Sequence, residues 1–327
     1  MLISILIPTH NRSAQLRRTL ESLRAVAAPP GVDAEIIVVA NACTDDTVAV
    51  VNAEAGSMPF ATRVVEESNV GLNCARNRAM KEAAVSGGDL LAFLDDDVWV
   101  EPAWLAELAD LFATTPADIA AGTVTLWWEA VEKPAWMTTR SEHLLSCVKY
   151  DGGKIELKEP GLAVGANFAF RKTVPQKIGE FTTWLDRTGS LPLAGGDTEF
   201  LARALAAGFR MFYSPGAAVK HWVAPNRITQ QYLGSVAYGA GLARSYLRRD
   251  FSAGAAFGTF FKHGFRIVSY WFLYAITRLF GAKRAYIHIY IRLMTSRGNV
   301  RGAWLRWRNR TPAGNKMEPP MHADSRR

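Results

Sequence analysis

Three adjacent carboxylates offer the clearest chemistry in this sequence: Asp95, Asp96 and Asp97, which directly follow the apolar run of residues 90–94. Neighbouring carboxylates repel one another unless a cation lies between them. Hard oxygen ligands of this kind suit Mg²⁺ or Mn²⁺ and leave room for phosphate oxygens. An acidic turn that caps the next helix is the simpler alternative. Because the preceding run is expected to be a buried strand, we favour the metal site.

Two further clusters combine glycines with charged side chains. Gly71 precedes a predicted helix whose Arg76 could reach a phosphate, although a solvated helix face is the alternative. Two glycines precede Asp197 and Glu199 at another predicted helix start, where either carboxylate could act as a general base. Asp197 is equally suited to cap that helix. His221 stands alone, and a single histidine is more often structural.

These residues follow predicted strands of an α/β sheet. Four apolar runs alternate with four helical patterns, the runs at 2–7, 35–40, 61–66 and 90–94 and the patterns at 13–26, 44–52, 72–85 and 102–112. Such alternation predicts a mostly parallel sheet with helices on both faces and a ligand site beyond the carboxyl ends of its strands. Later strands are expected near 122–128, 166–171 and 210–213, and a helix at 197–207.

The C-terminal part of the chain is predicted to be helical. Helical patterns occupy residues 228–249, 257–280 and 282–295, within a basic, aromatic region at 226–300. Residues 301–327 are polar and Arg-rich, and we expect them to form a disordered basic tail.

Taken together, the motifs resemble those of the family 2 glycosyltransferases, which have the GT-A nucleotide-sugar fold. The matching segments occur in the family's order over about residues 1–225, at 7–12, 35–47, 69–77, 93–97, 102–105, 165–171, 178–181, 196–203 and 221. The resemblance implies a Rossmann-like GT-A catalytic domain at 1–225. Residues 1–120 would form its nucleotide-sugar and metal half and residues 121–225 its acceptor half.

The resemblance also implies a role for individual residues. Asp97 and His221 would bind the metal, and Asp197 would be the catalytic base. The donor is expected to contact Pro8, Thr9, Asn11, Asn41, Arg76, Asp95 and Asp96. The acceptor side is expected to hold Gly165, Asn167 and Glu199.

Two departures from the family pattern leave an alternative open. The family usually has an acid at the position of Ala40 and a glutamate at that of Gly196. They raise the alternative of a non-catalytic GT-A module that binds a nucleotide or a glycan. A nucleotidyltransferase would need a glycine-rich phosphate loop after the first strand, and residues 8–12 contain no glycine.

The predicted activity is transfer of a single sugar. The Gln-x-x-Arg-Trp motif of the family's processive polymerases is absent from the sequence. A single addition is therefore favoured, and the resemblance implies a metal-dependent, inverting enzyme that uses a nucleotide-sugar donor. Its acceptor would be a glycan or a lipid-linked molecule in cell-surface glycan, exopolysaccharide or glycolipid synthesis.

Charge is distributed unevenly over the 327 residues, whose net charge is +8. Residues 227–327 hold 18 Lys and Arg and three acids, which leaves 20 bases and 27 acids before them. Aromatic, apolar helices flanked by Arg and Lys suit the headgroup region of an anionic membrane. A helical cap or an oligomer interface is the alternative. No nucleic-acid-binding module is recognisable, so nucleic acid is not expected as a partner.

Composition and cysteine usage indicate a globular protein of the cytoplasm. Hydrophobic residues make up 49% and charged residues 21%, which excludes a disordered, collagenous or disulfide-stapled chain. The three cysteines are widely spaced and form no metal-ligand pattern, and the N-terminus does not resemble a signal peptide. The longest uncharged aromatic run, 267–277, is shorter than the roughly 20 residues that span a bilayer. We expect a peripheral protein at the inner face of the cell membrane.

Overall fold

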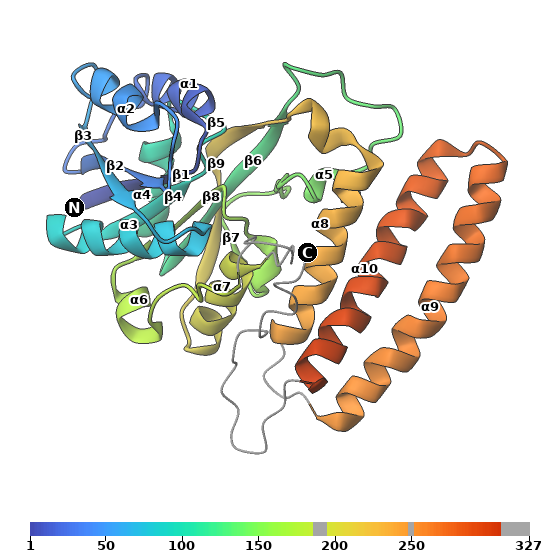
Figure 1. Cartoon of the computed structure of the whole chain (residues 1–327). Helices are drawn as coiled ribbons and strands as arrows, with labels where there is room; N and C mark the ends of the chain where they lie inside the picture. The colour runs from blue at the N-terminus through green and yellow to red at the C-terminus, as the bar shows by residue number, and fades with distance from the viewer. Residues whose placement is uncertain (186–194, 248–251, 309–327) are drawn as a thin grey trace. The chain divides into compact units, whose positions relative to one another are not determined.

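The computed structural model describes residues 1–185, 195–247 and 252–308, which belong to two compact units (Figure 1). The sheet unit comprises Met1–Val131, Leu145–Thr183 and Gly196–Val223. The helical unit comprises the described residues of Glu132–Leu144, Trp184–Gly195 and Ala224–Arg327. The domain division near residue 225 and the two halves of the catalytic domain remain predictions.

The sheet unit is built on one mixed sheet. Its parallel part has the order β3 (Ala61–Glu67), β2 (Asp33–Asn41), β1 (Leu2–Thr9) and β4 (Leu90–Leu94). Beyond β4 the sheet continues with β8 (Asn167–Arg171), β6 (Ile119–Trp127) and β9 (Met211–Trp222), and the short strands β5 (Val98–Val100) and β7 (Ile155–Leu157) pair with β9. Of these pairs, β6 and β9 are parallel, whereas β4–β8 and β6–β8 are antiparallel.

Alternating apolar side chains explain why helices cover both faces of this sheet. In β1, Ile3, Ile5 and Ile7 pack in a core with Leu16 and its neighbours in α1, whereas Leu6 points to the opposite core. The first face carries α1 (Ser13–Leu23), α2 (Thr47–Ala55) and α4 (Trp104–Thr114). The second carries α3 (Leu72–Ser86), α6 (Thr173–Ile178) and α7 (Gly196–Ala206). The predicted α/β architecture with a mostly parallel sheet is confirmed.

Strand β9 is much longer than the strand expected at residues 210–213. Pro215 and Gly216 indicate a break, and the register with β6 does shift opposite them, between Gly122 and Thr123. The strand continues because side chains bond its carbonyls at the shift. Thr123 Oγ1 donates to the Pro215 carbonyl, and Asn167 Nδ2 donates to that of Ala217. The extension carries His221 to a position opposite Val98 in β5.

The helical unit consists mainly of three long helices, α8 (Gln230–Leu247), α9 (Ala253–Leu279) and α10 (Lys283–Arg308), with a short α5 (Thr139–His143). In Figure 1, α10 lies between α8 and α9 and packs against both. Glycines permit the close approach of α8 and α10, since a Cβ on Gly298 would lie 2.0 Å from the Tyr238 carbonyl oxygen.

The end of α10 corrects one sequence expectation. Residues 301–308 are helical and do not belong to a disordered tail, while residues 309–327 lie outside the described part of the chain. No helix among the described residues has both the length and the apolarity needed to cross a membrane. Short 3₁₀ helices complete the secondary structure at Pro160–Leu162 and Pro225–Ile228.

Asn167 connects three elements of the sheet unit and provides a test of this fold. Its Nδ2 donates to the carbonyls of Thr123 and Ala217, at 3.0 and 2.8 Å, and its Oδ1 accepts from Trp104 Nε1 at 2.9 Å. The residue is 3% exposed. Asn167→Ala leaves three buried polar groups without this partner, so we expect a loss of about 3–5 kcal/mol in the free energy of unfolding.

Urea denaturation measures this loss, with the exposed Asn52→Ala as the matched control. We expect the control to unfold at the wild-type midpoint. A loss for Asn167→Ala no larger than that of the control would show that the β6–β8–β9 junction does not depend on this amide.

Candidate active site

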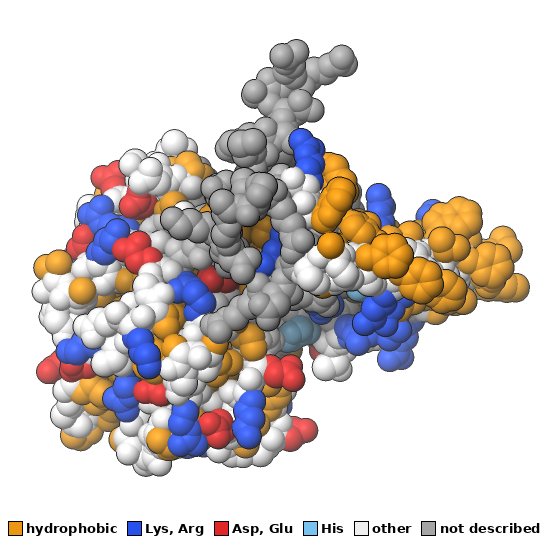
Figure 2. Space-filling model, turned by 90° about the horizontal axis from the view of Figure 1, so that it is seen from below, with side chains coloured by type: hydrophobic (Ala, Val, Ile, Leu, Met, Phe, Trp, Pro, Cys, Tyr) orange, Lys and Arg blue, Asp and Glu red, His pale blue; other side chains and the backbone are white. Residues whose placement is uncertain are grey.

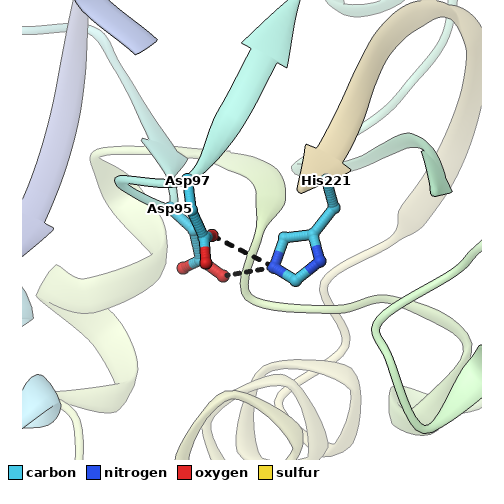
Figure 3. Close-up of side chains that lie close together, drawn as sticks. All are labelled: Asp95, Asp97 and His221. Atoms are coloured by element: carbon cyan, nitrogen blue, oxygen red, sulfur yellow. Dashed lines mark ion pairs between the residues drawn. The ribbon is translucent and has the colours of Figure 1, made fainter. Parts of the chain in front are cut away.

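Asp95, Asp97 and His221 come together at the carboxyl end of β4 (Figure 3). The acids directly follow β4, and His221 lies near the end of β9. Its Nε2 is 3.1 Å from Asp97 Oδ1 and 3.9 Å from Asp95 Oδ2. Asp97 and His221 are buried and Asp95 is partly exposed, and one ligand atom from each lies within 4.8 Å of the others. The group has the donor atoms and the size to hold a divalent cation.

Arg12 is a member of this site that the sequence analysis did not select. Its Nη1 lies 2.9 Å from Asp96 Oδ1 and 3.0 Å from Asp97 Oδ2. Thr9 Oγ1 donates to the other oxygen of Asp96 at 2.7 Å. The available signal was a basic residue at the end of the polar segment after β1, since that segment and the acidic triplet follow neighbouring strands.

Burial and a neighbouring charge alter the protonation of Asp96. Burial and the charge of Asp97 raise the pKa of Asp96 to about 6, although Arg12 and Thr9 act in the opposite direction. Burial acts to lower the pKa of Arg12, but the charges of Asp96 and Asp97 outweigh it and hold that pKa above its usual range. The two carboxylates, Asp96 and Asp97, therefore form a strongly anionic site, and Arg12 supplies a positive charge beside them.

The predicted donor residues cluster at the carboxyl ends of β1 and β2: Pro8 and Thr9 end β1, Asn11 follows it, and Asn41 ends β2. Asn11 has φ +50°, and its Oδ1 accepts from the Thr44 backbone at 2.7 Å, which ties the two loops together. Asn41 Oδ1 accepts from the Gly71 backbone at 2.8 Å. Gly71 has φ +144° and precedes the first residue of α3, where a side chain would be strained. The contacts of these residues with a nucleotide remain predictions.

A second polar cluster contains Arg76, Gly165 and Asp197. Asp197 Oδ2 accepts from the Gly165 backbone at 2.9 Å, and its Oδ1 accepts from that of Thr198 at 2.8 Å. A Cβ at position 165 would lie 2.2 Å from Arg76 Nη2 and 3.1 Å from Asp197 Oδ2. Glycine at this position therefore allows the guanidinium and the carboxylate to approach the same stretch of backbone.

Arg76 is buried, with its guanidinium over aromatic rings. It lies 5.4 Å from the ring centre of Phe181 and 5.9 Å from that of Phe168. Nη1 donates to Asn73 Oδ1 at 3.3 Å, and Nε has no hydrogen-bond partner among the residues that the structure describes. A buried cation with donors to spare is suited to an anionic ligand.

The two clusters adjoin one another through the backbone before β8. Gly165 donates its N–H to Asp197, and the carbonyl of the next residue, Ala166, accepts from the Asp95 N–H at 3.4 Å. The structure thus brings the predicted metal ligands and the predicted base to one end of the sheet unit.

Asn167 and Glu199 are held within the fold. Both are buried, and Asn167 bonds the strands as described above. Glu199 forms an ion pair with Arg203 at 2.7 Å and accepts from Thr182 Oγ1 at 3.1 Å, while Arg203 also donates to the Glu180 carbonyl. Glu199 therefore anchors the segment after α6. A contact of either residue with an acceptor remains a prediction.

The structure explains one departure from the family pattern. A Cβ on Gly196 would lie 2.1 Å from Asn73 Nδ2, so the Asn73 amide occupies the space into which a side chain at 196 would project. Asn73 Nδ2 also donates to the Thr182 carbonyl at 2.9 Å. Ala40 is buried in β2.

A small cavity next to Asp97 was also missed by the sequence analysis. Its volume is about 110 Å³, and it is lined by Ala14, Gln15, Arg18, Thr19, Asp97, Val98, Trp127 and Trp222. Arg18 lies 4.3 Å from the ring centre of Trp127. The sequence signal was a tryptophan at the end of two neighbouring strands, β6 and β9.

Two relatives match most of the chain in sequence. The chain is 29% identical over 231 residues to the succinoglycan biosynthesis protein ExoM of Rhizobium meliloti, covering 70% of each protein. It is 25% identical to a glucosyl-dolichyl phosphate glucuronosyltransferase of Haloferax volcanii, covering 68% of this chain and 69% of the relative.

Solved structures agree with the fold. S. aureus TarS 1-349 in complex with UDP superposes with a TM-score of 0.52 at 16% identity, covering 98% of this chain and 95% of TarS. GalNAc-T7 with UDP, GalNAc and Mn²⁺ gives a TM-score of 0.53 at 16% identity, over 75% of this chain and 51% of that one. The model of the family "Glycosyl transferase family 2" matches residues 4–179. The chain therefore belongs to glycosyl transferase family 2, and it is a glycosyltransferase with a GT-A fold.

Proposed function

We propose that this enzyme is metal-dependent and inverting, and that it transfers one sugar from a nucleotide-diphosphate donor to an acceptor hydroxyl. The observation that supports this best is that the acidic group and Asp197 both hydrogen-bond to the backbone of residues 165–166. The acidic group has the donor atoms and the size to hold a cation, and it consists of Asp95, Asp97 and His221. Asp95 bonds the Ala166 carbonyl, and Asp197 bonds the N–H of the neighbouring Gly165.

The donor set fits Mg²⁺ or Mn²⁺. Two carboxylates supply hard oxygen ligands, and the imidazole of His221 supplies a nitrogen that Mn²⁺ accepts more readily than Mg²⁺. Asp97 is the best placed ligand, because its Oδ1 faces His221 and it is buried. When bound, the cation would neutralise charge that develops on the leaving diphosphate. The Mn²⁺ and UDP in the GalNAc-T7 structure agree with this assignment.

The donor is proposed to lie along the carboxyl ends of β1, β2 and β4. Thr9 and Arg12 fix the position of Asp96, and the linked loops at Asn11 and Asn41 form the adjoining wall for the nucleotide. The TarS structures with UDP and UDP-GlcNAc support a nucleotide sugar of this type. The charge of Arg76 compensates the phosphates or the negative charge that forms during transfer.

Asp197 is proposed as the general base. Its two oxygens each accept one backbone N–H, which fixes the orientation of the carboxylate while lone pairs remain for a substrate hydroxyl. As the acceptor oxygen attacks the anomeric carbon, Asp197 accepts the hydroxyl proton and the bond from that carbon to the diphosphate oxygen breaks. Attack from the face opposite the leaving diphosphate inverts the anomeric configuration.

The acceptor is proposed to be a glycan or a lipid-linked molecule used in making surface glycan, exopolysaccharide or glycolipid. The names of the two relatives, one in succinoglycan biosynthesis and one acting on glucosyl-dolichyl phosphate, support these classes. We place the enzyme at the inner face of the cell membrane as a peripheral protein. The retained Asp97 and Asp197 favour catalysis over a module that only binds nucleotide or glycan.

Removing the base should stop transfer without preventing donor binding. For Asp197→Asn we expect kcat to fall by about 10²–10⁴, because the amide keeps the shape of the side chain but cannot take the proton. Nucleotide release in the presence of acceptor measures kcat, and calorimetry measures donor affinity. An equal loss of donor affinity would contradict the role of Asp197 as a base.

Removing the metal ligand should instead weaken metal-dependent binding of the nucleotide. In Asp97→Ala we expect the thermal stabilisation by nucleoside diphosphate with Mn²⁺ to disappear, because the anionic group can no longer hold the cation. The exposed Asp151→Ala serves as a matched control and should keep that stabilisation. Full wild-type activity in the presence of a chelator would refute the metal dependence.

Without metal, the crowded acids should make stability depend on pH. The folded pKa of Asp96, about 6, lies above the ordinary value of 3.8 for an aspartate, so the folded state holds this proton more tightly. Its stabilising effect is complete below about pH 4 and is lost as the pH rises through about 6, a difference of up to about 3 kcal/mol.

Asp96→Asn should remove this part of the pH dependence, because the amide does not ionise. Denaturation of the chelated protein between about pH 4 and 7 measures it, with Asp151→Asn as the exposed control. The same decline with pH in the wild type and in Asp96→Asn would show that Asp96 does not titrate in this range.

A further inference from the structure

Helix α9 exposes many of its large apolar side chains. Eight large apolar residues of α9 and its C-cap are 60–82% exposed: Phe257, Phe261, Phe265, Val268, Trp271, Phe272, Leu279 and Phe280. In the described part of the sheet unit, only Val70 and Val85 among the large apolar residues reach that exposure. The opposite face of α9, which packs against α10, contains the buried Thr259 and His263.

The exposed side chains form a continuous stripe. From Phe257 to Leu279 they recur at intervals of three, four or seven residues, except for the adjacent Trp271 and Phe272, which places them on one side of an α-helix. A helix of 27 residues is about 40 Å long, so the stripe extends over several helical turns. A helix that faces water normally exposes polar side chains on its outer side, whereas α9 exposes a stripe of apolar ones.

Basic residues border the stripe, and no acid accompanies them. Lys262 and Arg266 are exposed beside it, Arg278 lies near its end, and Lys283 and Arg284 begin α10. Helices α9 and α10 together contain ten Lys and Arg and no Asp or Glu. In Figure 2, orange apolar side chains project along this edge of the molecule, with blue Lys and Arg side chains next to them.

We propose that the exposed face of α9 binds the surface of an anionic phospholipid bilayer, with the helix parallel to the membrane plane. The Phe, Val and Leu side chains enter the acyl boundary, Trp271 lies at the interface, and the Lys and Arg side chains contact phosphate groups. This inference rests on the proposed function only for the place of the enzyme in the cell, not for its chemistry.

Charge favours a bilayer over a second copy of the chain. A symmetric dimer through this face would bring the cations of two acid-free hairpins together, and like charges across an interface repel. A bilayer that contains anionic lipid offers the complementary charge over the whole length of the stripe.

Vesicle sedimentation with the full-length protein tests the proposal. The two probes are vesicles of phosphatidylcholine alone and vesicles in which about one third of the lipid is phosphatidylglycerol. We expect the wild type to bind the anionic vesicles about tenfold more strongly and to lose this preference at high salt. A wild type that sediments with neither kind of vesicle would overturn the proposal.

Two variants separate the apolar and the charged contributions. Phe257→Ser/Phe261→Ser/Phe265→Ser should weaken binding to both vesicles by at least about tenfold, because exposed apolar surface provides the insertion. Lys262→Glu/Arg266→Glu should weaken binding to anionic vesicles only. The controls are Val85→Ser, an exposed apolar side chain of the sheet unit, and Lys149→Glu/Lys158→Glu, which changes the net charge equally.

The remaining outcomes are distinguishable from a failure of the proposed function. All variants should release nucleotide from the donor at the wild-type rate in detergent with a water-soluble acceptor. Vesicle binding without any transferase activity would refute the proposed function and leave this inference intact. A wild-type dimer that the triple Phe variant converts to monomer, together with unchanged vesicle binding by that variant, would show that the face joins two chains.

Discussion

Repulsion between buried carboxylates is the constraint around which the candidate active site is organised. Asp96 and Asp97 are adjacent in sequence and both are 5% exposed, so neither charge is well screened by water. Within the protein, Arg12 supplies a fixed positive charge and His221 lies 3.1 Å from Asp97. An additional divalent cation would complete the compensation. The site is therefore suited to binding a divalent cation.

The sheet fixes the position of every group that meets this constraint. Parallel pairing of β1 with β4 brings the segment with Thr9 and Arg12 beside the acids. The register shift in β9 allows that strand to continue past Pro215, and its end then delivers His221. Asn167 stabilises the same junction through three hydrogen bonds. The stability of this junction and the geometry of the candidate active site therefore depend on the same few residues.

The sequence predicted the parallel half of the sheet well because periodicity there is strong. Residues 90–94 are apolar throughout, and β4 has those bounds. The long β9 could not be predicted, because local sequence indicates a break at Pro215, whereas the bonds from Thr123 and Asn167 to this segment come from distant parts of the chain. Arg12 was missed for a related reason, since its partners lie 84 and 85 residues away. Residue types indicated Asp97 and Asp197, but their relation through residues 165–166 required the fold.

Anomalous diffraction at the manganese edge tests the central claim most directly. Crystals of the protein with a nucleoside diphosphate and Mn²⁺ would show where the cation lies. The account predicts a single strong peak that places the Mn²⁺ ion within coordination distance of Asp97 Oδ1 and His221 Nε2. Oxygens of the diphosphate would complete the coordination of the ion. Bound nucleotide with a peak elsewhere, or with no peak beside Asp97, would contradict it.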